Sequence, residues 1–191
     1  MAISVKEILV EGMLELCEIK SLEKITIKEL LIETGVSRQT FYNHFLDKND
    51  LIQYIYLSKI IPEYSTNISE DMNFHDSLLD SLKRMEIYHN FMKQACLIDT
   101  QNCLKDYIFE HCKEFDLKWH QKLYGKKEMP SALRFATEYH AMASSSMVLS
   151  WILSDMPSSC EEMADLINQL RSIGMEKLFK DGEVEKNPYI R

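Results

Sequence analysis

The segment TGVSRQTFYNHF, which begins at Thr34, combines side chains suited to packing with side chains suited to hydrogen bonding. Phe41 and Phe45 are four residues apart, so in a helix they share one face, and Val36 can join them on the inside. Tyr42 has a ring that can pack and a hydroxyl that can donate. The other polar side chains remain for the outer face: Arg38, Gln39, Thr40, Asn43 and His44. This pattern predicts a helix that packs on one side and presents a hydrogen-bonding surface on the other.

Capping signals make this helix the second of two short helices. Thr26 offers a hydroxyl N-cap, and Glu29 completes a capping box, so a helix is expected between Thr26 and Gly35. Gly35 occupies the position where helices end in a left-handed residue. Ser37 is then an N-cap for the next helix, expected through Phe45. Two short helices joined by such a turn predict a helix-turn-helix unit, whose second helix lies in the DNA major groove.

Helical periodicity continues along the rest of the chain. An amphipathic helix is expected over 4–20 and a connecting helix over 48–62, and the polar stretch 64–72 is the predicted domain boundary. Longer helices are expected at 74–88, 90–97, 100–124, 131–154 and 159–180. The sequence therefore predicts an all-α fold of about nine helices. Residues 1–60 form a three-helix DNA-binding domain with its connector, and residues 61–191 form a larger helical domain.

Composition restricts the class of protein. Five Gly and four Pro leave little material for the tight turns of a β fold. The formal net charge of -8 argues against coating nucleic acid by bulk charge, so any DNA binding must be local. Five cysteines without a CxxC pair indicate neither a disulfide framework nor a zinc ribbon, which fits a reducing cytoplasm. We expect no membrane partner, because the chain has neither a long apolar run nor a signal-peptide pattern.

Histidines and cysteines in the second part of the chain raise the alternative of a metal site or a thiol enzyme. They are His75, His89, His111, His120 and His140, with Cys96, Cys103 and Cys112. No HxxxH or CxxC pair occurs, and adjacent helical residues such as His111 and Cys112 point about 100° apart. The few glycines offer no oxyanion loop. Packing explains these residues better, so the sequence predicts no enzyme, no metal and no cofactor.

The stretch ITIKELLIETGVSRQTFYNHFLDKNDLI resembles the DNA-binding domain of the TetR family of transcriptional regulators. The matching motifs are Thr26–Ile27, Gly35–Ser37, Phe41–Phe45 and Lys48–Leu51. The resemblance covers the first third of the chain. The sequence departs from the family pattern at Leu31 and Thr34, where small Ala residues are usual, and in the turn over 18–23, which lacks the common Gly. These departures are expected to shift the second helix slightly against the third.

The resemblance implies a set of DNA contacts. Phosphate contacts are expected from Thr26, Thr40, Tyr42, His44 and Lys48, and base contacts from Lys28, Arg38, Gln39 and Asn43. Arg and Lys suit guanine and Gln and Asn suit adenine, with about 1 to 3 kcal/mol of discrimination for a good pair. Loss of one phosphate contact, for example at Lys48, is expected to lower the salt slope of binding by about 1.

The second domain is expected to supply an effector pocket and a dimer interface. Pocket candidates pair apolar surface with a polar tip, although core packing explains them equally well: Tyr88, Tyr107, His111, Trp119 and Tyr139. The last two helices resemble those that form a four-helix dimer interface in TetR-type proteins, the alternative being that they only close the monomer's core. The interface candidates are Ala141, Ser145, Val148, Leu149, Ile152, Ile167, Leu170, Ile173 and Gly174.

The resemblance implies a bacterial, cytoplasmic homodimer that binds a pseudo-palindromic operator in double-stranded DNA. It further implies a repressor that an unknown small-molecule effector releases. The alternative is a TetR-like coactivator whose C-terminal domain binds a partner protein. The sequence leaves the effector, the operator and the choice between repression and activation open.

Overall fold

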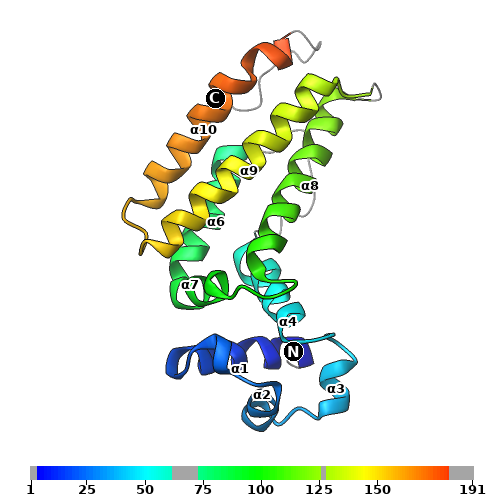
Figure 1. The fold of residues 1–191 in the computed structure, drawn as a ribbon, viewed down its shortest axis with the longest axis vertical. Helices are drawn as coiled ribbons and strands as arrows, with labels where there is room; N and C mark the ends of the chain where they lie inside the picture. Colours follow the sequence, from blue (N-terminus) through cyan, green and yellow to red (C-terminus); the bar gives the residue numbers. More distant parts are fainter. Residues whose placement is uncertain (1–3, 62–72, 126–127, 181–191) are drawn as a thin grey trace.

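A computed structural model describes residues 4–61, 73–125 and 128–180. These residues form nine α-helices, one 3-10 helix and one π-helix, and they include no strand. Figure 1 shows the first three α-helices at one end, a bundle of longer helices at the other, and α4 between them. The predicted all-α fold is confirmed. The predicted domain boundary at 64–72 lies outside the described residues.

The N-terminal head consists of α1 (Val5–Ile19), η1 (Leu22–Lys24), α2 (Ile27–Thr34) and α3 (Arg38–Tyr42). The predicted capping box of α2 is present: the Thr26 hydroxyl accepts the N–H of Glu29 at 3.2 Å, and a Glu29 carboxylate oxygen accepts the N–H of Thr26 at 2.8 Å. Gly35 has a φ of 68°, the left-handed conformation expected there. These signals fix the turn between α2 and α3.

Helix α3 ends at Tyr42, before the predicted end at Phe45. The N–H groups of His44 and Phe45 both donate to the carbonyl of Phe41 at 2.9 Å, so the chain tightens into a turn at this point. Phe41 and Phe45 are nevertheless buried, with ring centroids 5.8 Å apart. The prediction that they face inward is confirmed. They anchor α3 to the core of the head.

Helices α1 and α2 cross closely at Gly12. A Cβ atom at this position would lie 2.3 Å from the Cγ2 methyl of Thr34. Thr34 is one of the larger residues at which the sequence departs from the TetR pattern, and the missing side chain at Gly12 provides the space for its methyl group. The two positions therefore compensate each other within the packed head.

The connector runs from α4 (Lys48–Ile55) directly into the π-helix η2 (Tyr56–Ile60). Asp47 caps its start, because its carboxylate accepts the N–H of Asp50 at 2.9 Å. The N–H of Ile61 donates to the carbonyl of Tyr56, five residues back, at 3.2 Å. Short π segments inside helices are frequent at functional sites. Here the π segment faces the C-terminal bundle with the fully buried Tyr56.

The C-terminal bundle contains five helices among the described residues: α6 (Phe74–Ile87), α7 (His89–Leu97), α8 (Leu104–Tyr124), α9 (Ser131–Leu153) and α10 (Cys160–Lys180). Their existence and approximate bounds were predicted from periodicity, and only α8 begins clearly later than expected. Helices α8, α9 and α10 lie side by side as the longest elements in Figure 1. Large buried side chains such as Trp119 fill the space between them.

Candidate functional site

The outer face of α3 and of the turn that follows it presents the polar side chains that the sequence assigned to this segment. Arg38, Gln39, Asn43 and His44 are exposed, and Tyr42 is 42% exposed. Thr40 is half-buried, since its backbone N–H and hydroxyl both interact with the N-cap residue before α3. The helix thus combines a buried aromatic base with a polar outer surface, the arrangement that a major-groove helix requires.

Two pairs of side chains one helical turn apart organise this outer face. The amide of Gln39 donates to the side-chain oxygen of Asn43 at 3.0 Å. The guanidinium of Arg38 lies 5.4 Å from the ring centroid of Tyr42 and donates to its hydroxyl at 3.4 Å. Both pairs are held on the exposed surface, so the side chains are partly ordered before any partner binds.

The N-terminus of α2 holds the carboxylate of Glu29. Besides capping the Thr26 N–H, this carboxylate accepts from the Thr26 hydroxyl at 2.8 Å and from the Lys20 ammonium at 2.5 Å. The Lys20 contact and the capping bonds lower the pKa of Glu29 to about 2. The expected phosphate contact of Thr26 stays a prediction, and it requires a phosphate to replace Glu29 as the acceptor of the Thr26 N–H or hydroxyl. Lys28 is exposed on the same helix.

Lys48 lies at the start of α4 and points back to η1. Its ammonium donates to the backbone carbonyls of Leu22, Glu23 and Ile25, each at 3.0 Å. An ammonium has three donors, and these carbonyls use all of them. Burial lowers the pKa of Lys48. The structure therefore gives Lys48 a role in positioning α4 against the head, and the phosphate contact expected from the sequence is the alternative that remains to be tested.

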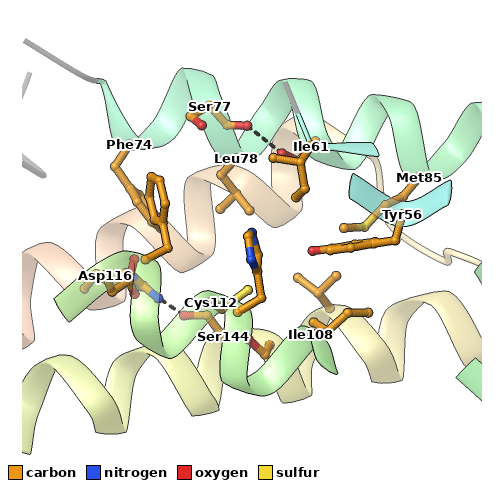
Figure 2. Close-up of a pocket in the computed structure, with 16 residues that line it drawn as sticks. Tyr56, Ile61, Phe74, Ser77, Leu78, Met85, Ile108, Cys112, Asp116 and Ser144 are labelled. Atoms are coloured by element: carbon orange, nitrogen blue, oxygen red, sulfur yellow. Dashed lines mark hydrogen bonds and ion pairs between the residues drawn. The ribbon is translucent and has the colours of Figure 1, made fainter. Parts of the chain in front are cut away.

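The C-terminal bundle contains a partly open cavity of about 120 Å³ among the described residues. Figure 2 shows that its walls come from the connector and from α6, α8, α9 and α10. The apolar walls include Ile61, Phe74, Leu78, Met85, Ile108 and Val148. Tyr56 of η2 also lines it, so the cavity contacts the element that leads to the head.

A buried ion pair lies at one side of this cavity. An Nη atom of Arg171 is 2.6 Å from a carboxylate oxygen of Asp116, and both side chains are only 4% exposed. Arg171 also donates to the Ser144 hydroxyl at 3.0 Å, and its guanidinium lies 4.4 Å from the ring centroid of Phe74. Burial raises the pKa of the Asp116 carboxyl, and the Arg171 charge opposes that shift. The pair places a charged, hydrogen-bonded group against an apolar wall.

Among the predicted pocket residues, only His111 lines the cavity. Tyr107 stacks on His111 with centroids 5.8 Å apart but lies behind it. Trp119 is fully buried and stacks on Phe74 at 5.9 Å, so it supports the wall from outside. Tyr88 is half-buried away from the cavity, and Tyr139 is 62% exposed on α9. Pairing a ring with a polar tip does not by itself distinguish residues that line this cavity from residues that pack behind it.

Sequence reasoning missed Tyr56, Cys112 and the pair Asp116–Arg171. Asp116 and Arg171 are 55 positions apart on different helices, and each has the charge of an ordinary surface residue, so no local pattern marked them. Tyr56 falls within the connecting helix predicted over 48–62 and was not among the pocket candidates. The position of Asp116, buried within a helix that is otherwise charged on its outer face, becomes evident only when α8 and α10 are brought together.

The predicted dimer residues divide between core and surface. The structure places most of them inside the protomer: Ala141, Ser145, Val148, Leu149, Ile152 and Ile167. Small residues at 141 and 145 face neighbouring helices within the bundle, where they permit close packing. Gly174 also serves packing inside the protomer, since a Cβ there would lie 2.3 Å from the Nε2 atom of His140. Leu170 and Ile173 remain exposed.

An exposed apolar face runs along α9 and α10, on a different register of α9 from the one predicted. We define the α9/α10 apolar face by large exposed side chains of these two helices: Phe135, Tyr139, Met142, Leu166, Leu170 and Ile173. The spacing of 135, 139 and 142, and of 166, 170 and 173, places each set on one side of its helix. A patch of this kind on a protein surface marks an interaction site.

The head and the cavity together define an all-α helix-turn-helix protein with a ligand-sized cavity in its second part. The profile of a family described as "Transcriptional regulator C-terminal region" (TetR_C_8) matches residues 72–172, more than half of the chain. The chain belongs to the TetR family of transcriptional regulators.

Two solved structures show the same fold. "Dihydroxyacetone kinase operon activator DhaS" is similar with a TM-score of 0.69 and 18% identity, over 92% of this chain and 98% of that one. A TetR-family transcriptional regulator from Streptomyces coelicolor is similar with a TM-score of 0.59 and 14% identity, over 96% of this chain and 86% of that one. No curated protein sequence matches the chain. In the described part of the chain, no helix is both long and apolar enough to cross a membrane.

Proposed function

We propose that this protein is a sequence-specific DNA-binding regulator that acts as a homodimer and responds to a small molecule. The observation that carries the proposal is the two-sided build of α3. Phe41 and Phe45 fix the helix to the head, and the exposed Arg38, Gln39 and Asn43 are left on its outer side. These three side chains have the hydrogen-bonding groups that read base edges in the major groove.

The proposed DNA contacts are of two kinds, contacts to bases and contacts to phosphates. We assign base contacts to Arg38, Gln39, Asn43 and Lys28, all of which are exposed. We assign phosphate contacts to Thr26, Thr40, Tyr42 and His44. Lys48 supports the head through its three carbonyl contacts. Because the chain carries a formal net charge of -8, binding depends on this limited surface and is sensitive to salt.

A second copy of the chain covers the α9/α10 apolar face. A two-fold dimer would carry two heads, and its half-sites would lie about 34 to 36 Å apart or at a multiple of that distance. Residues 1–60 form the DNA head with its connector in this scheme, and residues 61–191 form the effector-binding and dimerisation domain.

The connector links the cavity to the DNA-binding head. Tyr56 of η2 lines the cavity, while Lys48 at the other end of the same connector binds the carbonyls of η1. A ligand that prefers one placement of the connector shifts the population of head arrangements by its differential affinity. The first hypothesis is that the small molecule releases a repressor from its DNA site. The neighbour described as an operon activator makes activation through the same head the second candidate.

The cavity favours a small molecule over a partner protein as the regulator. A coactivator that binds a partner protein needs an exposed apolar patch besides the dimer face, and it does not need an internal cavity. The large exposed apolar side chains of the bundle gather mainly on the α9/α10 apolar face, which the second copy covers.

Selection of bound duplexes from a random DNA pool tests the proposal. The wild-type protein should enrich a two-fold symmetric site, and the double variant Gln39→Ala, Asn43→Ala should not. Repeating the selected-site binding with candidate small molecules then tests control. Failure of the wild-type protein to enrich any symmetric site would contradict the proposed function.

A further inference from the structure

The volume of the cavity restricts the size of its ligand. At about 120 Å³ it is close to engineered apolar cavities of about 150 Å³, which hold one benzene molecule. A ligand with one ring, of about six to eight non-hydrogen atoms, fills such a space.

The ion pair restricts the charge of the ligand. Asp116 and Arg171 are the charged residues among the described side chains that line the cavity, and they neutralise each other at 2.6 Å. An anionic ligand would have to compete with Asp116 for Arg171, and a cationic ligand would compete with Arg171 for Asp116. Either leaves a buried charge without its partner, which costs more than the new contact returns. Burial also lowers the pKa of His111, which favours its neutral imidazole form.

Polar side chains interrupt the apolar walls at a few places. The Tyr56 hydroxyl, the Cys112 thiol and the Ser145 hydroxyl belong to residues that line the cavity. Figure 2 shows the Tyr56 ring reaching in from the connector with its hydroxyl toward the middle of the cavity. A single polar group on a ligand can therefore reach the Tyr56 hydroxyl while the rest of the ligand stays against apolar side chains.

We propose that the cavity binds a compact, uncharged molecule of about one ring that hydrogen-bonds the Tyr56 hydroxyl. Its role as the regulator's control ligand rests on the proposed function. Because Tyr56 belongs to η2, the ligand's polar group contacts the connector, while its apolar body contacts α6 and α8 through side chains such as Leu78 and Ile108. The ligand thereby joins the connector to the bundle.

A matched panel of one-ring compounds tests the proposal by calorimetry on the full chain at pH 7. Phenol should bind at least about tenfold more tightly than benzoate or benzylammonium, because only the charged compounds disturb the ion pair. Toluene, which lacks the hydroxyl, should bind about fivefold more weakly than phenol. Equal or tighter binding of benzoate or benzylammonium would overturn the proposal, and so would the absence of binding by every compound.

Two variants locate the binding. In Tyr56→Phe, the affinity for phenol should fall to the affinity for toluene, and the affinity for toluene should not change. Tyr124 is a half-buried tyrosine outside the cavity, so Tyr124→Phe should bind both compounds as the wild type does. Asp116→Asn removes the carboxylate that pairs with Arg171, so benzoate should gain affinity relative to phenol. If circular dichroism shows that Asp116→Asn does not fold, binding of the compounds to the wild type and to Tyr56→Phe still tests the proposal. Retention of the phenol preference in Tyr56→Phe would overturn the assigned contact.

The outcomes separate this proposal from the proposed function. If the protein enriches a symmetric DNA site but binds none of the compounds, the ligand class is wrong and the DNA-binding role stands. If phenol binds with the predicted pattern and leaves affinity for the selected DNA unchanged, the ligand class is supported. Control through this cavity is then excluded.

Discussion

The ammonium of Lys48 donates to the backbone carbonyl of Leu22 at 3.0 Å, which ties the first turn of α4 to η1. Leu22 also makes a hydrogen bond through its own N–H, which donates to the Gln94 side-chain oxygen on α7 at 2.6 Å. The Gln94 amide in turn donates to the Cys17 carbonyl at 3.1 Å. Leu22 is therefore a point at which the connector, the head and the bundle meet.

Lys48→Met tests the positioning role of this side chain. The variant keeps the length of the side chain and leaves the carbonyls of Leu22, Glu23 and Ile25 without their donor. We expect the free energy of unfolding in urea to fall by about 1 to 3 kcal/mol. The slope of log affinity against log salt for the selected DNA should stay at the wild-type value. Unchanged stability with a salt slope lowered by about 1 would instead identify Lys48 as a phosphate contact.

Gly12→Ala tests the close crossing of α1 and α2. The added methyl would meet the Thr34 Cγ2 atom at 2.3 Å, so the variant should lose about 1 to 3 kcal/mol of unfolding free energy. Thr34→Ser removes that methyl and keeps the hydroxyl, which donates to the Leu30 carbonyl at 2.7 Å. The double variant should therefore recover most of the loss. A double variant as unstable as Gly12→Ala alone would show that the strain arises elsewhere.

His120 makes stability depend on pH. Burial, with the nearby Arg171 charge, lowers the pKa of His120 to about 3, against an ordinary value of about 6.5 in the unfolded chain. Between these values the unfolded state binds the proton and the folded state does not, so stability is lost as pH falls from about 6.5 toward 3. This one group contributes a slope of at most about 1.4 kcal/mol per pH unit.

His120→Asn retains a partner for the Thr137 hydroxyl, which lies 2.8 Å from the His120 Nδ1 atom. Urea unfolding between pH 6 and 5 should show a flatter dependence in this variant than in the wild type. The exposed His44→Asn is the matched control and should keep the wild-type slope. Equal slopes in His120→Asn and the wild type would contradict the assignment.

Leu170→Glu tests the α9/α10 apolar face as the dimer interface. Leu170 is 64% exposed in the protomer, and a charge buried between two copies would oppose association. Light scattering at micromolar concentration should show a dimer for the wild type and a monomer for the variant. Leu97→Glu is the control, because Leu97 is also 64% exposed but lies on α7, away from this face. A variant that remains dimeric would place the interface elsewhere.

Local signals were sufficient for the architecture of the head. Thr26 with Glu29, Gly35 and Ser37 each act within four residues, so capping and turn chemistry could be read from the sequence. The inward orientation of Phe41 and Phe45 followed from their spacing. The early end of α3 did not follow, because the backbone tightens at Phe41 under tertiary packing.

The cavity and the apolar face depend on the relative rotation of long helices, which sequence spacing does not fix. In α9, apolar or small residues occur nearly all round the helix, so both the face through Ala141 and Ser145 and the face through Tyr139 and Met142 fitted a helical stripe. Only packing against α8 and α10 decides which is buried. The same packing brings Asp116 to Arg171.

The most direct test of DNA recognition by α3 is the ratio of affinities for the selected site and for a random duplex of equal length. The wild type should prefer its site by a factor of at least about 10³. Gln39→Ala should reduce that ratio by about 5- to 100-fold per half-site and leave binding to the random duplex unchanged. The exposed Glu33→Ala is the control. A wild-type ratio near one, or an unchanged ratio in Gln39→Ala, would contradict base reading by this face.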